Sequence, residues 1–428
     1  MIRKVFMFTF FLLLVISWAI AADPELTPIQ QLGKSIFFDV NLSINKNQSC
    51  AACHDPEVGW TGPIEEINKH GAVYEGSIPG RFGDRKPPSS AYATQSPIFH
   101  LTKQGLFVGG NFWDGRATGE KLGNPAADQA QGPFLNPMEQ ALPDSACVVY
   151  RVCTSAYPIP FEDVWGSGAC DITWPGNVET VCATEGGVVN LSFGDRAKSE
   201  MAYDNIALSI AAYEASPEVN AFTSKYDYSL KGNYKLTKLE RKGFALFQGK
   251  GKCKLCHISN GQEALFTDYS FDNLGVPKNP ENPVYIYNPG FIDPGLGGFL
   301  KAAGYPEEIY DLEWGKHKVP TLRNVDLRSD PDFVKTYGHN GYFKSLEGIV
   351  HFYNTRDVLP TCSGDYTEAQ ALAAGCWPAP EVQQNVNTAE LGDLGLTPEE
   401  EGAIVAFLKT LSDGFESPGR FGRRLFRK

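Results

Sequence analysis

The sequence predicts a mainly α-helical protein made of two similar halves with long irregular loops. One pattern, Cys-x-x-Cys-His, occurs twice, and each half also contains helix signals before and after it. This pattern attaches c-type haem: its two thiols bond to the porphyrin and its histidine binds the iron. The residues concerned are Cys50, Cys53 and His54 in the first copy and Cys253, Cys256 and His257 in the second. We therefore expect two cytochrome c-like haem domains.

The two halves begin with the same helix-start signals. Thr27 precedes Pro28 and has Gln30 three residues later, while Thr237 has Glu240 three residues later, so both are expected to form capping boxes. In each half a Gly follows this Thr by six residues and a Phe follows the Gly by four, at Gly33, Phe37, Gly243 and Phe247. This internal repeat indicates one architecture present twice.

The repeat sets the expected domain boundaries. Residues 22–225 form the N-terminal domain and residues 226–428 the C-terminal domain, with a linker near 216–235. Apolar residues at helical spacing predict closing helices over 205–215 and 397–411. Two further stretches are rich in Gly and Pro and are expected to be loops over the haem edges and between the domains: 59–88 and 272–294.

Residues 1–21 are expected to be a secretory signal. Arg3 and Lys4 supply the positive charge, an apolar run follows, and small residues precede the expected cut. A retained membrane anchor is the alternative, although the run is short for a spanning helix. We expect an exported protein, in the periplasm or at the cell surface, without stable membrane insertion after cleavage.

The net charge of −12 argues against binding to nucleic acid or to anionic membranes. An acidic surface would suit docking with a basic partner such as a small c-type cytochrome. Solubility alone explains the charge equally well.

Six cysteines lie outside the haem-binding patterns, and an even number predicts disulfides in an exported protein. Cys362 and Cys376 stand apart in the C-terminal half, so these two are expected to bond. The pairing of the other four is left open by the sequence. They lie in a stretch of about 144–194 that is expected to be a surface insertion: Cys147, Cys153, Cys170 and Cys182.

Several further segments carry a family resemblance. Residues 109–117 read Gly-Gly-Asn-Phe-Trp-Asp-Gly-Arg-Ala, and 129–139 contain Gln-Ala-Gln-Gly-Pro and Asn-Pro-Met-Glu. Residues 318–325 read Lys-Val-Pro-Thr-Leu-Arg-Asn-Val, and 338–341 read Gly-His-Asn-Gly. Together with the haem-binding patterns, these segments closely resemble the bacterial di-haem cytochrome c peroxidase and MauG superfamily. The resemblance spans nearly the whole chain after the signal, and it implies two covalently bound c-type haems and hydrogen peroxide as substrate.

The resemblance implies roles around the first haem, whose iron would be bound by His54. Glu139 matches the family's acid/base, which moves a proton between the peroxide oxygens as their bond breaks. Gln129 would hold the peroxide or a water molecule, and Pro133 would shape the pocket. Trp113 matches a tryptophan that relays electrons between the haems.

The second haem iron, bound by His257, needs a ligand on its other face. After signal removal only Met138 and Met201 remain, so its own domain offers no methionine. The family's methionine position falls on Tyr353, and MauG-type members carry a tyrosine ligand there. A phenolate favours higher oxidation states of iron than a thioether does. His351 is the rival ligand, but on a helix it would point about 200° away from Tyr353, so only one of them can face the iron.

Two other positions compare with the family in different ways. His70 lies 16 residues after His54, the spacing at which many members carry a removable ligand of the first iron, but it is equally well explained as a surface histidine. Lys86 stands where the family usually has an Asn that helps to bind calcium between the domains. An ammonium group is not an oxygen ligand, so Lys86 argues against calcium. Three histidines are expected to be structural or to bond haem propionates: His100, His317 and His339.

The sequence is compatible with three functions. The first is an exported di-haem peroxidase that reduces hydrogen peroxide at the N-terminal haem, with electrons passing through the C-terminal haem from a small c-type cytochrome or another redox protein. The second is a MauG-like, peroxide-driven oxidation of aromatic residues in a partner protein, which Tyr353 favours. The third is a non-enzymatic di-haem electron carrier. It would leave no open iron and need no acid/base, so Gln129 and Glu139 argue against it.

Overall fold

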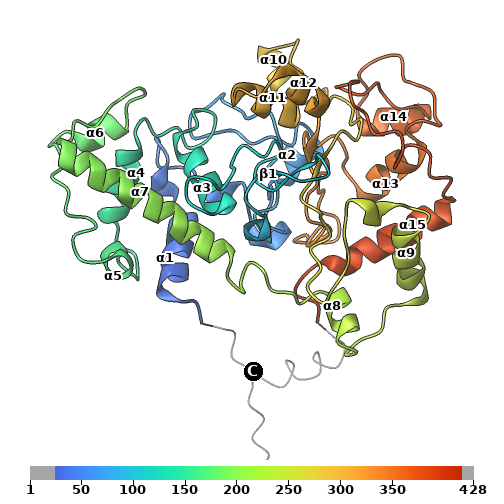
Figure 1. Cartoon of the computed structure of the whole chain (residues 1–428), viewed down its shortest axis with the longest axis horizontal. Coiled ribbons are helices and arrows are strands. Elements are labelled where there is room, and N and C mark those ends of the chain that lie inside the picture. The colour runs from blue at the N-terminus through green and yellow to red at the C-terminus, as the bar shows by residue number, and fades with distance from the viewer. Residues whose placement is uncertain (1–24, 417–428) are drawn as a thin grey trace, which may run out of the picture.

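In each half of the molecule, the helix before the haem-binding pattern crosses the helix that closes that half. The computed structural model describes residues 25–416, so the expected signal, residues 1–21, lies outside the described residues. Figure 1 shows the first helix pair, α1 (Pro28–Phe37) and α7 (Phe193–Glu214), on one side and the second, α9 (Lys238–Gln248) and α15 (Pro398–Leu408), on the other. The mainly α-helical class is therefore confirmed.

The remaining elements are short. In the N-terminal half they are α2 (Glu65–Lys69), β1 (His100–Leu101), β2 (Phe107–Val108), α3 (Pro125–Leu135), α4 (Ser145–Cys153), α5 (Phe161–Trp165) and α6 (Val178–Cys182). In the C-terminal half they are α8 (Lys225–Leu230), β3 (Phe271–Asp272), α10 (Val284–Tyr287), α11 (Gly295–Ala302), α12 (Glu307–Tyr310), β4 (His317–Lys318), α13 (Leu346–Thr355) and α14 (Glu368–Ala374). The strands form two antiparallel pairs, β1 with β2 and β3 with β4.

The repeated glycines lie where the paired helices cross. A Cβ atom on Gly33 would lie 1.9 Å from the carbonyl oxygen of Ser209 in α7. A Cβ atom on Gly243 would lie 1.8 Å from the carbonyl oxygen of Ala403 in α15. Only a residue without a side chain allows the two backbones to approach so closely. The equal spacing from the capping Thr to the Gly in the two halves thus reflects the same helix crossing in each half.

The predicted helix starts are confirmed. The Thr27 N–H donates to Gln30 Oε1 at 3.0 Å at the start of α1. At the start of α9, the Thr237 N–H donates to Glu240 Oε2 at 2.7 Å, and the Glu240 N–H donates to Thr237 Oγ1 at 3.2 Å. These bonds satisfy backbone donors that have no partner within the helix.

The repeated phenylalanines form equivalent aromatic clusters. Phe37 packs edge-on against Trp60, with ring centroids 5.8 Å apart, and against Tyr213 of α7 at 5.7 Å. Phe247 packs against Phe266 at 6.0 Å and against Phe407 of α15 at 5.3 Å. Each cluster joins the crossing helices to the segment that follows the haem-binding pattern.

Three sequence expectations about helices and loops need correction. Helix α7 begins at Phe193 rather than near 205, because its first turns are polar and largely exposed, so the apolar pattern reveals only its buried end. The expected linker contains helix α8, whose Tyr226 packs against Phe266 and Phe407. The two stretches expected to be loops contain the short helices α2 and α10.

The cysteine-rich stretch is more deeply buried than expected. Its disulfides join Cys147 to Cys182 and Cys153 to Cys170, while Cys362 bonds Cys376 as predicted. Helix α4 lies within this stretch, and its Val148 and Val149 are completely buried in the core that α7 shares. The prediction of a surface insertion is therefore wrong for α4, because its apolar face completes that core.

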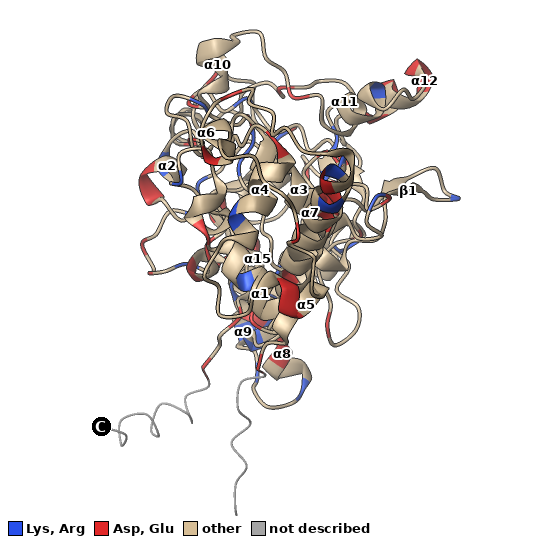
Figure 2. Ribbon diagram, turned by 90° about the vertical axis from the view of Figure 1, so that its left-hand side faces the viewer, with Lys and Arg blue, Asp and Glu red and all other residues tan. Residues whose placement is uncertain are grey.

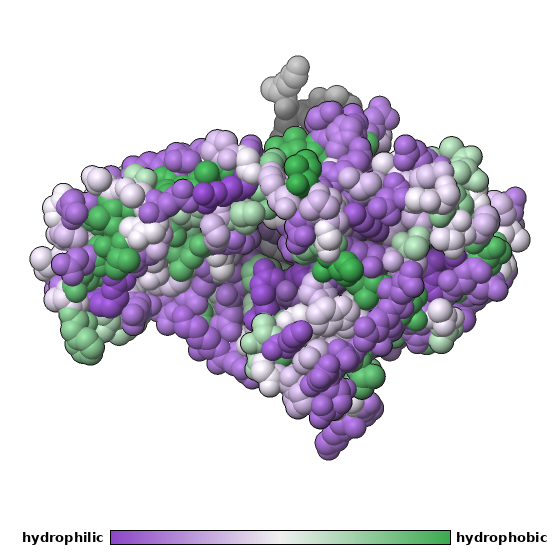
Figure 3. Space-filling model, turned by 90° about the horizontal axis from the view of Figure 1, so that it is seen from above, coloured by the Kyte–Doolittle hydropathy of each residue, from purple (hydrophilic) through white to green (hydrophobic). Residues whose placement is uncertain are grey.

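The molecular surface is mixed in character. Acidic residues occur on α2, α5 and α12 among other elements, with basic residues between them (Figure 2). Seen from above, hydrophobic residues form small separate patches among hydrophilic ones (Figure 3). Between residues 25 and 416, no helix has the length and apolar character that crossing a membrane requires.

Replacing Gly243 by Ala is expected to lower the free energy of unfolding by about 2 kcal/mol, because the new methyl group would collide with the Ala403 carbonyl. Gly402 is the matched control: it lies in α15 with open space around it, so Gly402→Ala should be neutral or raise stability by up to about 1 kcal/mol. Chemical unfolding of the haem-loaded variants, followed by circular dichroism, measures both. Equal effects of the two substitutions would contradict the close crossing.

Candidate functional site: two haem cavities

The first cavity gathers the residues that the sequence predicts for the N-terminal haem. Cys50, Cys53 and His54 line it, and so do the four residues expected to do chemistry: Trp113, Gln129, Pro133 and Glu139. Gln129 and Pro133 are four residues apart on α3, so they lie on one face of this helix. The structure thus brings together residues separated by up to 89 positions in the chain.

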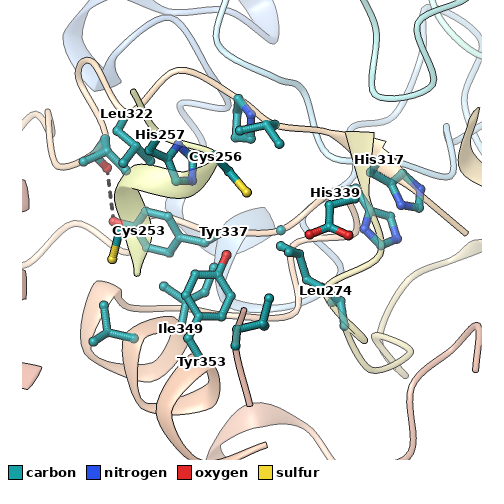
Figure 4. A pocket seen from close by; sticks show the side chains of 18 of the residues that line it. Cys253, Cys256, His257, Leu274, His317, Leu322, Tyr337, His339, Ile349 and Tyr353 are labelled. Atoms are coloured by element: carbon teal, nitrogen blue, oxygen red, sulfur yellow. Dashed lines mark hydrogen bonds between the residues drawn. The ribbon is translucent and has the colours of Figure 1, made fainter. Parts of the chain in front are cut away.

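The second cavity is built around the second haem-binding pattern. Cys253, Cys256 and His257 line it together with Tyr353 of α13 (Figure 4). Trp113 lines both cavities and is fixed between them. Its indole Nε1–H donates to the Lys86 carbonyl at 2.9 Å, and its own carbonyl accepts from the Lys318 N–H at 2.7 Å.

The two histidines are oriented by the same kind of hydrogen bond. His54 Nδ1 lies 3.2 Å from the Trp60 carbonyl oxygen, and His257 Nδ1 lies 2.7 Å from the Phe266 carbonyl oxygen. A carbonyl oxygen only accepts, so Nδ1 must carry the proton, and Nε2 keeps its lone pair for iron. Burial lowers the pKa of His54 to about 4 and also lowers that of His257, which favours the neutral, iron-binding imidazole.

The thiols of the two patterns suit covalent haem attachment. Every other cysteine of the chain is in a disulfide, whereas these four are not. In both patterns a short 3₁₀ turn, Cys50–Ala52 or Cys253–Leu255, precedes the histidine. The residues present therefore fit two c-type haems, held by Cys50, Cys53 and His54 and by Cys253, Cys256 and His257.

Glu139 lies in the turn after α3, at the wall of the first cavity. Burial raises the pKa of its carboxyl group, while a hydrogen bond from Asn136 Nδ2 to Oε1, at 2.7 Å, partly opposes that rise. A raised pKa makes the carboxylate a stronger base, which suits a fixed carboxyl group to take up and release a proton.

Tyr353 and His351 face different surroundings on α13. Tyr353 is directed into the second cavity, and its hydroxyl has no hydrogen-bond partner within residues 25–416. His351 does not line that cavity; its Nδ1 lies 3.1 Å from Glu401 Oε1. Burial, reinforced by the nearby Cys253 and Cys256 thiols, raises the pKa of the Tyr353 phenol. Of the two rival ligands, only Tyr353 shares a cavity with His257.

His70 lies at the surface and not at the first cavity. Its side chain is exposed, with Nδ1 2.9 Å from Glu281 Oε1 and Nε2 3.3 Å from Glu66 Oε1. The structure therefore does not bring His70 to the iron position beside His54. His100 is also exposed, with Nδ1 2.8 Å from the Ile98 carbonyl oxygen.

The structure reveals a buried ionic cluster that the sequence reasoning missed. Asp293 accepts two hydrogen bonds from Arg85, both at 2.7 Å, and its Oδ2 lies 3.2 Å from His317 Nε2. The His317 ring stacks on His339, with centroids 3.6 Å apart, at the wall of the second cavity. His317 and His339 were expected to be structural or to bond haem propionates, but no sequence pattern indicates that Asp293 lies beside them.

A second missed residue is Glu214, near the C-terminal end of α7. It lines the first cavity, is 3% exposed and has no ion-pair or hydrogen-bond partner for its carboxyl group among the described residues. Burial raises its pKa to about 8. The sequence could have indicated this site, because Glu214 is a single acidic residue on the buried face of an otherwise apolar helix segment.

The residues around Lys86 do not fit a calcium ion. Lys86 Nζ donates at 3.0 Å to both Thr61 Oγ1 and the Pro87 carbonyl, so these oxygens already face an ammonium group. Calcium is bound by six to eight oxygens, usually including carboxylates. The nearby carboxylate of Asp293 is engaged by Arg85 through both of its oxygens.

Comparisons with known proteins agree with this geometry. A family model described as di-haem cytochrome c peroxidase matches residues 28–235. The methylamine utilization protein MauG of Paracoccus denitrificans is 34% identical over 400 residues, which cover 92% of this chain and 90% of that protein. The cytochrome c551 peroxidase of Nitrosomonas europaea is 26% identical over 331 residues, covering 77% and 74%. The crystal structure of the diheme peroxidase BthA from Burkholderia thailandensis matches with a TM-score of 0.69 and 26% identity, covering 91% of this chain and 87% of that one.

Replacing Cys253 and Cys256 together by Ser is expected to reduce the covalently bound haem from two per chain to one, because thioether bonds hold c-type haem. Pyridine haemochrome absorbance per mole of chain measures this. The matched control replaces Cys362 and Cys376, which form a disulfide in the same half, and should keep both haems. Two covalent haems in the first variant would contradict the assignment.

Proposed function

Since the chain belongs to the di-haem cytochrome c peroxidase and MauG family, we propose that it is an oxidoreductase that reduces hydrogen peroxide at its N-terminal haem. The observation that carries this proposal is the first cavity, where Glu139 and Gln129 lie together with the haem-binding His54. When bound, the haem iron there supplies the two-electron chemistry that cleaves the peroxide O–O bond.

The role proposed for Glu139 is proton transfer. Its carboxylate takes the proton from one peroxide oxygen and returns it to the other, which leaves as water. Asn136 holds Oε1 in place, and burial keeps the pKa raised, so the group can both accept and release the proton. Gln129 orients the peroxide by hydrogen bonding, and Pro133 shapes the pocket.

Trp113 is proposed to connect the two haems. It lines both cavities, and hydrogen bonds through its indole N–H and its carbonyl fix its position. An aromatic ring held between two redox centres shortens the path along which an electron travels. Electrons from a small c-type cytochrome or another protein donor would enter at the C-terminal haem.

Tyr353 supports a second candidate function, peroxide-driven oxidation of aromatic residues in a partner protein. We propose that Tyr353 binds the second iron opposite His257, because its hydroxyl faces that cavity and has no hydrogen-bond partner among the described residues. A phenolate ligand lowers the haem potential and favours loss of electrons. The 34% identity to a MauG protein agrees with this candidate. A non-enzymatic carrier explains neither Glu139 nor Gln129.

Export is proposed together with this function. Residues 1–21 have the composition of a secretory signal, and three disulfides are typical of proteins outside the reducing cytoplasm. The protein would then encounter peroxide and its protein donor in the periplasm or at the cell surface.

Glu139→Gln is expected to lower peroxide turnover by about 10²- to 10⁴-fold, because the amide cannot take up the proton. In the unchanged protein, turnover should fall as the pH drops through the raised pKa of Glu139, since only its carboxylate accepts the proton. Steady-state peroxide reduction with a reduced small cytochrome as donor, measured across pH, tests both. Glu120→Gln, an exposed position in the same half, is the control and should retain turnover. Full activity of Glu139→Gln with both haems present would remove Glu139 from the mechanism.

Tyr353→Phe is expected to change the electron paramagnetic resonance spectrum of one haem in the oxidised protein from low-spin to high-spin, because the second iron loses a ligand. The control is Tyr337→Phe: Tyr337 lines the same cavity, but its hydroxyl already donates to the Val325 carbonyl at 3.2 Å. Tyr353→Met should raise the potential of that haem. A spectrum that changes with His351→Ala and not with Tyr353→Phe would assign the ligand to His351 instead.

A further inference from the structure

A buried ammonium group without a carboxylate partner lies between the two haem cavities. Lys86 is 8% exposed and lines the second cavity. None of the ion pairs formed by the described residues includes Lys86. Burial alone lowers its pKa to about 8, with no charge opposing that shift. A buried ammonium needs either a charged partner or an acceptor for each of its donors.

The backbone of Lys86 is fixed to both halves of the molecule. Its N–H donates to the His339 carbonyl at 2.9 Å, and its carbonyl accepts from Trp113 Nε1 at 2.9 Å. The side chain then reaches Thr61, which follows the first haem-binding pattern. The positive charge of Lys86 also lowers the pKa of His54. Lys86 therefore sits where charge affects both haem sites.

Two other lysines line the same cavity, and in both of them the ammonium group has three hydrogen-bond acceptors. An ammonium group has three N–H donors. Lys335 Nζ donates to three backbone carbonyls, at 2.6 to 2.9 Å, and Lys318 Nζ donates to the Ser96 hydroxyl and the Gly109 and Gly110 carbonyls, at 2.6 to 3.0 Å. Lys86 Nζ has only two such acceptors, so one donor remains for a ligand in the cavity.

The chemistry of the missing partner follows from the cofactor that this cavity fits. A haem carries propionate carboxylates on its edge, and a carboxylate is the natural acceptor for a buried ammonium. The same position does not fit calcium, as the contacts of Lys86 and Asp293 show. We propose that the Lys86 ammonium binds a propionate of the C-terminal haem and supplies, between the two haems, the positive charge that calcium supplies elsewhere in the family.

The first test uses the unchanged holoprotein. The calcium content, measured by mass spectrometry of the purified protein, should be far below one ion per chain. Treatment with a chelator, and then addition of calcium chloride, should leave both haem midpoint potentials and the electron paramagnetic resonance spectrum unchanged. One tightly bound calcium ion, whose removal shifts a potential, would overturn the proposal. The result of this test does not depend on whether any variant folds.

The second test removes the charge. Lys86→Gln should lower the midpoint potential of the C-terminal haem, because a fixed positive charge favours the reduced iron. A tenfold fall in its reduced-to-oxidised ratio at fixed electrode potential is expected, which corresponds to about 59 mV for a one-electron couple. Lys86→Arg keeps the charge and should keep the potential. Lys103→Gln makes the same charge change at an exposed loop position and should have no effect.

An unchanged potential in Lys86→Gln, or the same shift in Lys103→Gln, would overturn the proposal. The proposal rests on haem binding and not on peroxide reduction. Calcium content and potentials are read without peroxide, so its failure is distinguishable from a failure of the proposed enzyme activity.

Discussion

The architecture of each half depends on one hydrogen bond, from the imidazole Nδ1–H of the haem-binding histidine to the carbonyl of a buried aromatic residue. Trp60 accepts it in the first half and Phe266 in the second. Both residues have left-handed backbones, with φ of 61° and 54°, which a bulky side chain adopts only when its surroundings enforce it. The enforcing contact is the packing of each ring against Phe37 or Phe247. Helix crossing, aromatic packing and iron-ligand orientation are therefore mechanically linked.

The two halves share this scaffold but place different chemistry around it. The first cavity receives a carboxyl group and a primary amide from α3 and the turn after it, so small polar ligands can be held and protonated there. The second receives a phenol from α13, which lines the second cavity and packs on α15 as α3 lines the first cavity and packs on α7. Tyr353 thus faces the second haem-binding pattern across its cavity, whereas Glu139 and Gln129 line the first. The difference between the halves lies in the side chains that α3, the turn after it and α13 present to the cavities, and not in the crossing helices.

Much of this arrangement was predictable because it is local in sequence. Helix starts, the helix-crossing glycines and the haem-binding patterns are short motifs with fixed spacing, and these were found. The carbonyl groups that accept from the two histidines could not be predicted from the repeat. Trp60 follows its histidine by six residues and Phe266 by nine, so the two acceptors do not occupy equivalent positions in the sequence. The cluster of Arg85, Asp293 and His317 joins segments 208 and 24 residues apart through folding alone. Helix α4 was misplaced for a related reason, since its disulfides suggested a surface staple while its apolar face belongs to the core of α7.

The second cavity is bordered by lysine side chains that form no ion pair with any described residue. The chain carries a net charge of −12, yet Lys86 and Lys335 are buried at this cavity and Lys318 is partly buried, none of them in an ion pair with a described residue. Burial lowers the pKa of Lys318 to about 7 and depresses that of Lys335 strongly, so each cation costs stability in the chain alone. Carboxyl groups in the first cavity are shifted the opposite way, toward the neutral acid. Both shifts have the same cause, because burial disfavours a charged group of either sign. Lys318 and Lys335 offset the cost of burial with three hydrogen bonds each, whereas the propionate proposed for Lys86 would add a third acceptor to its two.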